Sequence, residues 1–327
     1  MGIIETEGLT KIYVRDVIDT EFGRLRIRLT NRKTVALQDL SLDVQQGEIF
    51  GLLGPNGAGK TTAIKILMGI HFPTSGSARL MGKPLGDREV KKRIGFLPEN
   101  PYFYDYLKGW EFLDFYGQLY GMDKKTRRRK IERLLDQVGL THAADRPLRG
   151  YSKGMNQRIG LAQALMNDPE IVFLDEPQSG LDPLGRKEVR DIIVSLRDEG
   201  KTVFFSSHIL SDAEMICDRV AILYRGKLQS LGTLGSLLSQ SVRDWEIVLR
   251  GVSDEFMDRW RPRLVRLEKS DGDFWVIAKE EATTHELIRE ATAAGGVLIQ
   301  LLPRRESLED YFIRQVQGSP EPRGAAA

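Results

Sequence analysis

The stretch Gly54-Pro-Asn-Gly-Ala-Gly-Lys60-Thr61 decides the fold, because it fits the phosphate-binding pattern G-x-x-x-x-G-K-[ST]. The apolar run Ile49–Leu53 precedes it and a helical pattern, Thr62–Gly69, follows, which is the context that the pattern requires. Glycines let the backbone curl so that several N–H groups point at one anion, and the helix adds the positive end of its dipole. Lys60 is expected to meet the β- and γ-phosphates, and the Thr61 hydroxyl to bind Mg²⁺. The sequence therefore predicts a site for a nucleoside triphosphate.

A pair of carboxylates follows a second apolar run. Ile171–Leu174 is too continuously apolar for a half-exposed strand, so it predicts a buried central strand. Asp175 and Glu176 stand at its C-terminal end, where ligands bind in open α/β sheets. Hydrolysis of a γ-phosphate needs a cation to neutralise charge and a group to orient water. We therefore expect Asp175 to hold Mg²⁺ and Glu176 to polarise the attacking water.

His208 follows a third apolar run, Val203-Phe-Phe-Ser-Ser. A lone histidine is more often structural than catalytic. Here, however, the histidine ends the strand that follows the carboxylates along the chain, where a donor could reach the γ-phosphate. We therefore interpret His208 as a catalytic residue.

Strand-like and helix-like segments alternate through about residue 235, which predicts an α/β domain over residues 1–235. This alternation ends after Ser230–Ser241, and the pattern of residues 241–316 predicts a small α+β module. Its predicted order βαββαβ suggests a ferredoxin-like fold. Residues 317–327 are expected to form a disordered tail.

Local signals define the elements of this module. Thr283-x-x-Glu286 is interpreted as a capping box, Gly295 as a helix stop and Ser307 as the cap of a last helix. Asp254–Trp260 is predicted to be a helix. The predicted strands are Trp245–Leu249, Leu264–Leu267, Phe274–Ala278 and Val297–Leu302, with a hairpin turn at Asp271-Gly272-Asp273.

A polar, mostly basic stretch lies between Tyr13 and Thr34. Arg24–Leu29 alternates strictly between basic and apolar residues, as a half-exposed strand should, and Glu21-Phe22-Gly23 is a candidate turn. We expect an extended hairpin. A solvated sheet edge is the default interpretation, and a partner-binding arm is the alternative.

Two further segments fall within a predicted helical subdomain at about residues 100–165. Nine aromatic residues gather in residues 102–120, and Trp110, Leu113, Tyr116 and Tyr120 share helical spacing, so a helical core is the default interpretation. Lys124–Lys130 (KKTRRRK) is a basic run. A solvated helix face is its default interpretation, and proximity to anionic lipid is the alternative.

The bulk composition limits the possible classes of protein. The chain has 327 residues, of which 41% are hydrophobic and 29% charged, and a formal net charge of +2, which is too mild to argue for nucleic acid. Its single cysteine, Cys217, excludes a disulfide framework within the chain and fits a reducing cytosol. No apolar run approaches the ~18 residues of a membrane span, and no signal peptide is visible. If the protein serves a membrane, we expect it to sit there through a partner.

Five ordered motifs together resemble those of an ABC-type ATPase over roughly residues 3–235. The phosphate loop resembles the family's Walker A motif, Tyr151-Ser-Lys-Gly-Met155 its signature loop, Ile171–Glu176 its Walker B strand, Ser179-Gly-Leu-Asp182 its D-loop and Ser206-Ser-His208 its switch histidine. Tyr13 matches the aromatic residue that stacks on adenine. The resemblance implies a P-loop NTPase core with a helical subdomain and an antiparallel β edge.

The resemblance also implies a head-to-tail dimer with two ATP molecules between a phosphate loop and the opposing signature loop. Ser152 and Gly154 would then contact ATP bound by the other subunit. Nucleotide-binding residues implied in this way are Tyr13, Gly54, Asn56, Gly57, Gly59, Lys60, Thr61, Thr62, Ser152, Gly154 and Asp182. ATP and Mg²⁺ are the expected ligands, with Thr61, Asp175 and Glu99 around the metal.

Two positions depart from the common family pattern. The signature reads YSKGM instead of LSGGQ, so Ser152 and Gly154 keep the phosphate contacts while Lys153 and Met155 differ. Glu99 stands where most of the family has Gln. Glutamate there is similar to one bacterial branch that serves ABC-2 export permeases and often carries a C-terminal extension ending like Ser307-Leu-Glu-Asp-Tyr-Phe312.

The expected function is that of the ATP-hydrolysing subunit of a transporter, on the cytoplasmic face of the membrane. Its partners would be a membrane permease and a second copy or a paralogous ATPase, with no nucleic acid. The alternative is a soluble ABC ATPase acting on nucleic acid or the ribosome. Such relatives carry a long coiled coil, a second cassette or zinc-binding cysteines, and none of these is visible here. A regulatory module without turnover is a third interpretation, which Glu176 disfavours.

Overall fold

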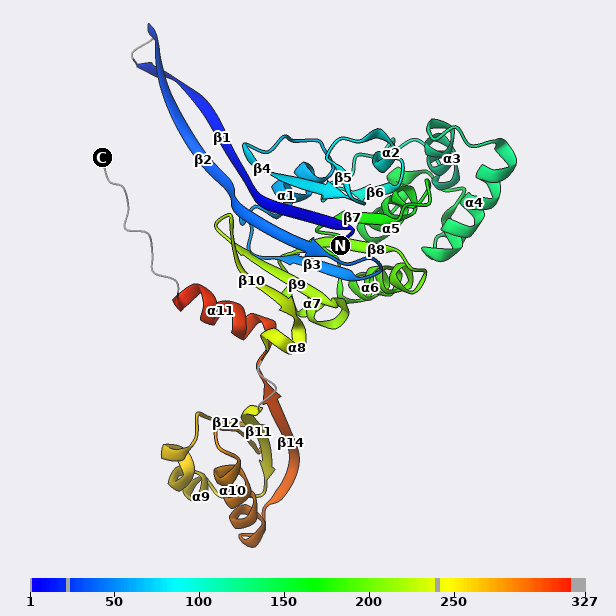
Figure 1. Cartoon of the computed structure of the whole chain (residues 1–327). Coiled ribbons are helices and arrows are strands. Elements are labelled where there is room, and N and C mark those ends of the chain that lie inside the picture. The colour runs from blue at the N-terminus through cyan, green and yellow to red at the C-terminus, as the bar shows by residue number, and fades with distance from the viewer. Residues whose placement is uncertain (1, 22–23, 239–241, 319–327) are drawn as a thin grey trace. The chain divides into compact units, whose positions relative to one another are not determined.

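The computed structural model describes residues 2–21, 24–238 and 242–318 (Figure 1). The chain divides into two compact units, residues 1–234 and 235–327, which are described separately below.

The strands of the first unit are β1 (Ile4–Glu21), β2 (Arg24–Val44), β3 (Ile49–Leu53), β4 (Ser75–Leu80), β5 (Lys83–Pro84), β6 (Ile94–Leu97), β7 (Ile171–Asp175), β8 (Thr202–Ser207), β9 (Arg219–Tyr224) and β10 (Lys227–Thr233). Its helices are α1 (Lys60–Leu67), α2 (Arg88–Lys91), α3 (Gly109–Leu119), α4 (Lys124–Gln137), α5 (Lys153–Ala164), α6 (Pro183–Asp198) and α7 (Leu210–Ile216), with short 3₁₀ turns at Thr141–Ala143 and Leu148–Gly150.

A six-stranded sheet forms the centre of this unit, in the order β10-β9-β3-β8-β7-β6. All neighbours are parallel except the antiparallel edge pair β9 and β10. Every residue of β3, β7 and β8 is buried, as their continuous apolar runs predict for central parallel strands. The predicted α/β core is therefore confirmed, and the carboxyl ends of five strands meet at one edge.

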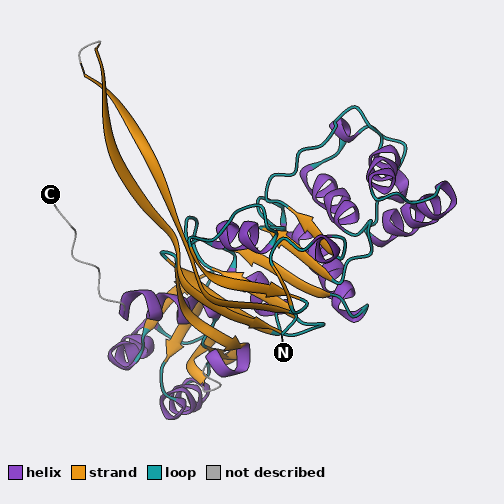
Figure 2. Cartoon of the chain, turned by 45° about the horizontal axis from the view of Figure 1, so that its top comes forward, coloured by secondary structure: helices purple, strands orange, loops and turns teal. Residues whose placement is uncertain are grey.

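A second, antiparallel sheet has the order β2-β1-β4-β5. Helix α1 contacts β2 as well as β7 and β8, and apolar residues of both sheets share one core with it. Strands β1 and β2 pair from Ile4 and Val44 out to Glu21 and Arg24, which confirms the predicted hairpin (Figure 2). Phe22 and Gly23 of the predicted turn lie outside the described residues.

Helices α3, α4 and α5 pack on one another, and α5 also contacts β6 (Figure 1). Helix α3 carries part of the aromatic cluster, but its four residues at helical spacing do not form one buried face. Leu113 is buried, whereas Trp110 is 39% exposed and Tyr120, just past the helix, is 43% exposed. The interpretation as a helical core therefore holds for only part of the cluster.

The elements of the second unit are α8 (Leu234–Leu237, which straddles the boundary), β11 (Val242–Arg250), α9 (Asp254–Trp260), a 3₁₀ turn (Arg261–Arg263), β12 (Arg266–Ser270), β13 (Asp273–Ala278), α10 (Glu281–Ala293), β14 (Val297–Arg305) and α11 (Leu308–Gly318). Its antiparallel sheet has the order β12-β13-β11-β14, and side chains of α9 and α10 share its core. Two helices on a four-stranded βαββαβ sheet of this order form a ferredoxin-like fold, as predicted.

Two local expectations in this unit are wrong. Helix α10 begins at Glu281, so Thr283 lies inside its first turn and is not the first residue of a capping box. Helix α11 extends to Gly318, so the first two residues of the predicted tail are helical, while residues 319–327 lie outside the described part. The cap at Ser307 is confirmed, because its hydroxyl accepts a hydrogen bond from the Asp310 amide at 3.1 Å.

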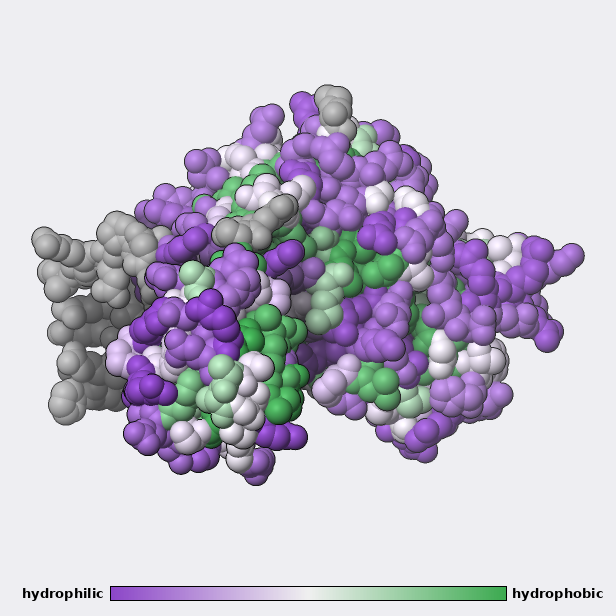
Figure 3. All heavy atoms as spheres, turned by 90° about the horizontal axis from the view of Figure 1, so that it is seen from below, coloured by the Kyte–Doolittle hydropathy of each residue, from purple (hydrophilic) through white to green (hydrophobic). Residues whose placement is uncertain are grey.

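No helix among the described residues is both long enough and apolar enough to cross a bilayer. On the side seen in Figure 3, hydrophilic residues cover most of the surface and hydrophobic residues form separate patches.

Candidate active site

Four neighbouring strands deliver the predicted site residues to one edge of the six-stranded sheet. The phosphate loop follows β3, His208 follows β8, Asp175 ends β7, and Glu99 comes two residues after β6. The four strands are adjacent in the order β3-β8-β7-β6 and all run parallel. Segments up to 154 residues apart in sequence (from residue 54 to residue 208) are thereby placed side by side.

The phosphate loop needs glycine at positions with a left-handed backbone. Gly54, Gly57 and Gly59 have φ angles of 152°, 80° and 106°. A Cβ atom on Gly54 would lie 2.2 Å from a backbone carbonyl oxygen, and one on Gly59 would lie 2.4 Å from another. Only glycine therefore fits these two positions without moving the backbone. Helix α1 begins at Lys60, directly after this curled segment.

The Lys60 ammonium is buried at the centre of the site. Its Nζ atom lies 2.9 Å from Oε1 of Glu176, and both side chains are only 6% exposed. The same nitrogen donates hydrogen bonds to the carbonyls of Gly54 at 2.7 Å and Pro55 at 3.2 Å. Since a phosphate carries the same sign of charge as Glu176, an anionic ligand in the loop can compete with that carboxylate for Lys60.

Oxygen donors suited to a hard cation meet beside the lysine. The Thr61 hydroxyl donates to Oδ1 of Asp175 at 3.1 Å, and Asp175 is buried. A hydroxyl and a carboxylate at this distance fit Mg²⁺, which takes few protein ligands and completes its shell with phosphate and water. Glu99 lies on the same sheet edge and is exposed. The geometry therefore fits a magnesium ion held by Thr61 and Asp175, with Glu99 within the same region.

Ser206, which sequence reasoning did not select as a site residue, links the two carboxylate positions. Its hydroxyl donates to Oδ1 of Asp175 at 2.6 Å and accepts from the Glu176 amide at 3.0 Å. It is fully buried in β8. A hydroxyl inside an otherwise apolar central strand was the available signal, because a buried polar group needs a partner.

Glu176 contacts His208 as well as Lys60. Nδ1 of His208 lies 2.7 Å from Oε2 of Glu176, and the His208 amide donates to the same oxygen at 3.3 Å. Glu176 also has a φ angle of 51°, a conformation that costs a non-glycine residue free energy and often marks functional positions. Its carboxylate therefore lies between a lysine and a histidine.

The signature loop and D-loop residues cap helices elsewhere in the unit. Ser152 begins α5, where its Oγ accepts from the Met155 amide at 3.2 Å, and Asp182 begins α6, where its Oδ1 accepts from the Gly185 amide at 2.7 Å. A Cβ atom on Gly154 would meet nothing within 4 Å. Among the described residues, no hydrogen bond or ion pair joins these three residues to the phosphate loop, so the single chain does not assemble them into one site.

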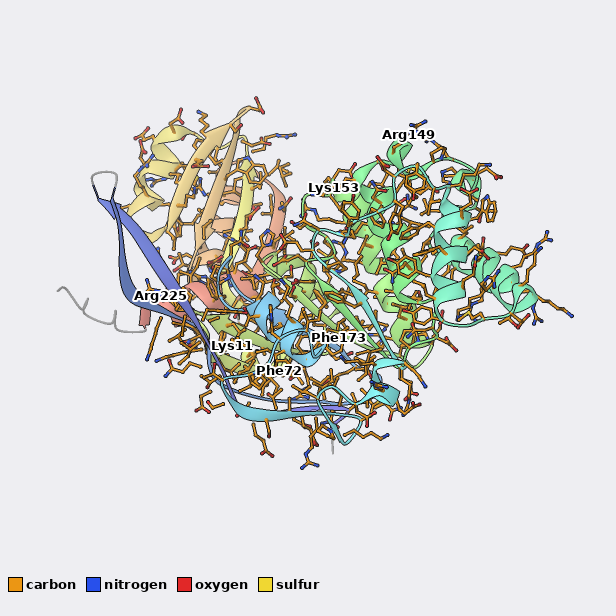
Figure 4. All side chains as sticks on the ribbon, turned by 90° about the horizontal axis from the view of Figure 1, so that it is seen from above. Lys11, Phe72, Arg149, Lys153, Phe173 and Arg225 are labelled. Atoms are coloured by element: carbon orange, nitrogen blue, oxygen red, sulfur yellow. The ribbon has the colours of Figure 1, made fainter. Side chains whose placement is uncertain are left out.

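Lys153 lies against the D-loop of its own chain. A Cβ atom on Gly180 would fall 2.1 Å from its Nζ atom. Figure 4 shows Lys153 and Arg149 in the same helical region.

Tyr13 contacts neither the phosphate loop nor the carboxylates through any hydrogen bond or ring contact within the described residues. Its ring meets His71, which follows α1, edge to face at 6.0 Å, and Lys11 places its ammonium 5.1 Å from the ring centre. The ring is half-buried. Stacking of adenine on Tyr13 therefore stays a prediction.

Comparison with known proteins agrees with this geometry. Residues 37–179 match the ABC transporter family. The chain is 48% identical over 97% of its length, and 85% of the relative's, to an uncharacterized ABC transporter ATP-binding protein of Synechocystis. It is 41% identical to the bacitracin transport ATP-binding protein BcrA of Bacillus licheniformis, over 97% of this chain and 98% of that one. A solved ATP-binding subunit of an ABC transporter shares 28% identity at a TM-score of 0.58, over 72% of this chain and 91% of that one.

Proposed function

The chain belongs to the ABC transporter family as an ATP-binding subunit with ATPase activity, and from this premise we propose how its residues bind and hydrolyse ATP. The observation that carries the proposal is the convergence of Lys60, Thr61, Asp175, Glu176 and His208 at one sheet edge. ATP phosphates bind to the loop amides and to Lys60. Gly54, Asn56, Gly57, Gly59 and Thr62 complete that cradle.

Thr61 and Asp175 would hold Mg²⁺, and the ion would supply positive charge that offsets the charge of the phosphates. Ser206 keeps Asp175 in place and fixes the backbone of Glu176, so one hydroxyl orients both carboxylates. Glu99, exposed at the same sheet edge, would bind the ion directly or through water.

Glu176 orients and polarises the attacking water. In the single chain its carboxylate pairs with Lys60 and His208. When a phosphate binds to Lys60, Oε1 of Glu176 can accept a hydrogen bond from the attacking water, and His208 donates to the γ-phosphate. The three residues therefore act together on the γ-phosphate and on the attacking water.

A second subunit completes the site. Ser152 and Gly154 stand at the start of α5, where a helix N-terminus favours an anion. Within the described part of the chain no hydrogen bond or ion pair joins them to their own phosphate loop, so we propose that they bind ATP held by a second copy or a paralogous ATPase. Asp182 contributes at the same interface, and Tyr13 supplies the surface for adenine.

Subunits of this family partner with a membrane permease. We propose that the permease docks at the exposed aromatic residues near α3, which keeps this chain at the cytoplasmic face of the membrane. A groove of about 490 Å³ there is lined by Tyr104, Tyr106, Leu107, Trp110, Glu111, Asp114, Phe115 and Gln118. Large rigid aromatics with part of their surface exposed are typical anchors of an interface.

We further propose that the partner is an export permease of the ABC-2 type. Glu99 and the segment Ser307–Phe312 support this, together with relatives named for bacitracin transport. The alternative of a non-transport ATPase acting on nucleic acid or the ribosome has no support among these relatives.

The decisive experiment is Glu176→Gln, which keeps the shape of the side chain and removes its charge. We expect ATP turnover to fall about 100-fold or more, the scale of a lost general base, while ATP binding survives. Trapped ATP should then hold a dimer that size-exclusion chromatography detects.

Glu170→Gln is the matched control. Glu170 directly precedes β7, at its opposite end from Glu176, and pairs with Arg93 on the surface. ATP turnover by the Glu170→Gln variant should equal that of the wild type. Turnover of Glu176→Gln within a few-fold of the wild type would exclude the proposed role.

A further inference from the structure

The first turn of α4 places basic side chains where the helix itself disfavours them. Lys124 and Lys125 open the helix, and its first turn contains no acidic residue. The amino end of a helix carries a partial positive charge, so cations there lower helix stability. The carboxylate of the preceding Asp123 is engaged by the amides of Lys125 and Thr126 at 2.9 and 3.1 Å. A sequence that breaks a local rule in this way suggests a role outside folding.

Ion pairing divides the cations of residues 124–130 into two groups. Arg127, Arg128 and Lys130 pair with Asp114, Glu132 and Asp168. Lys124, Lys125 and Arg129 are exposed, and none of them has an ion pair within the described part of the chain. Since the whole chain carries a net charge of only +2, these three side chains form a local surplus of positive charge.

Exposed apolar side chains come shortly before these cations along the chain. Leu119 ends α3 at 66% exposure, and Tyr120 follows it at 43%. Three residues, 121–123, separate them from α4. This turn is rigid, because Arg127 donates to Asp114 of α3 at 2.6 Å and to the Met122 carbonyl at 2.8 Å. Packing between α3 and α4 therefore places the end of α3 near the start of α4 (Figure 1).

We propose that this corner, formed by Leu119, Tyr120, Lys124, Lys125 and Arg129, binds the anionic phospholipid surface of the membrane directly. Cationic side chains attract anionic headgroups, while an adjacent leucine and tyrosine enter the interfacial region. A nucleic acid would use the cations but offers no place for an exposed leucine. The contact supplements docking on the permease and requires neither ATP nor the catalytic residues.

The test is flotation of the full-length chain with vesicles of equal parts phosphatidylglycerol and phosphatidylcholine, compared with pure phosphatidylcholine. We expect binding to the anionic vesicles alone, and loss of that binding at about 0.5 M salt, where the Debye length falls to about 4 Å. Each cation near an anionic surface contributes about five-fold to binding. Lys124→Glu with Lys125→Glu should therefore weaken it by at least about 25-fold.

This double variant separates binding from folding. Acidic residues in the first turn of a helix are favourable, so its thermal stability should equal or exceed that of the wild type. Its basal ATPase activity should not change, which keeps this test independent of the proposed hydrolysis mechanism. Leu119→Ser should weaken vesicle binding to a smaller extent.

Lys227→Glu with Lys279→Glu is the matched control, because both lysines are exposed and the change in net charge is the same. It should retain vesicle binding. Equal binding of the wild type to both kinds of vesicle, full binding by the Lys124 and Lys125 variant, or an equal loss in the control would overturn the proposal.

Discussion

The two units of this chain contain sheets of opposite organisation: the central strands of the first are buried on both faces, whereas the strands of the second are partly exposed. In the first unit β3, β8, β7 and β6 are parallel, so their carboxyl ends share an edge where Lys60, Asp175, Glu176 and His208 meet. In the second unit all strands are antiparallel and successive strand ends alternate between two edges.

Charged residues of the second unit form ion pairs between neighbouring elements. Arg250 pairs with Asp273 on the neighbouring strand, and Lys269 pairs with Asp254. Parallel topology therefore concentrates chemistry from distant sequence, whereas antiparallel topology distributes it. Substitutions in either sheet can break this contrast.

Gly154→Asp should abolish ATP hydrolysis and leave nucleotide binding by the single chain unchanged. A side chain at this position meets nothing within 4 Å in the single chain, so folding should not suffer. An added carboxylate would face the phosphates bound by the second subunit and repel them. Steady-state ATPase rates and nucleotide binding by the monomer check this.

Mixing Gly154→Asp with Lys60→Ala provides the control. Heterodimers of these two variants contain one intact composite site and should regain part of the activity. Loss of ATP affinity in monomeric Gly154→Asp would show that the residue acts within its own chain.

Ser206→Ala should lower turnover at least about ten-fold, because a hydrogen bond to a charged group contributes about 1.5–3 kcal/mol. The change removes the hydroxyl that links Asp175 to the Glu176 amide. Ser270→Ala, at the end of an antiparallel strand in the second unit, should leave turnover unchanged. Equal effects of the two substitutions on kcat would contradict the contrast between the sheets.

Glu99→Ala should reduce basal hydrolysis by only a few-fold but remove most of the stimulation by the permease. Glu99 is exposed at the sheet edge, and the segment after it contributes Tyr104 and Tyr106 to the aromatic groove. The loop can therefore connect the ATP site to the proposed docking site of the permease. ATPase activity with and without the reconstituted permease measures this effect. Unchanged stimulation would exclude a coupling role for this loop.

Truncation after Gln240 should have the smallest effect and leave ATP binding intact. The second unit has its own apolar core and carries none of the ATP-binding motifs. Binding of a fluorescent ATP analogue, with circular dichroism as the folding control, tests this. Insoluble protein or lost binding would show that the second unit supports the first.

The sequence alone determined the motifs and the elements that carry them. The glycines of the phosphate loop, the apolar runs and the residues that end them are local features, because backbone geometry and burial act on neighbouring residues. For the same reason the order of elements in the second unit could be predicted. The capping box at Thr283 was wrong because the start of a helix also depends on the packing of its surroundings.

Only the tertiary structure decided which side chains meet. The pairing of Lys60 with Glu176, the bridging hydroxyl of Ser206 and the left-handed backbone of Glu176 depend on the order of strands in the sheet. The exposure of Leu119 beside Lys124 likewise depends on how α3 packs against α4. A sequence specifies which residues each strand or helix presents, but contacts across more than a hundred residues follow from topology, which no local pattern encodes.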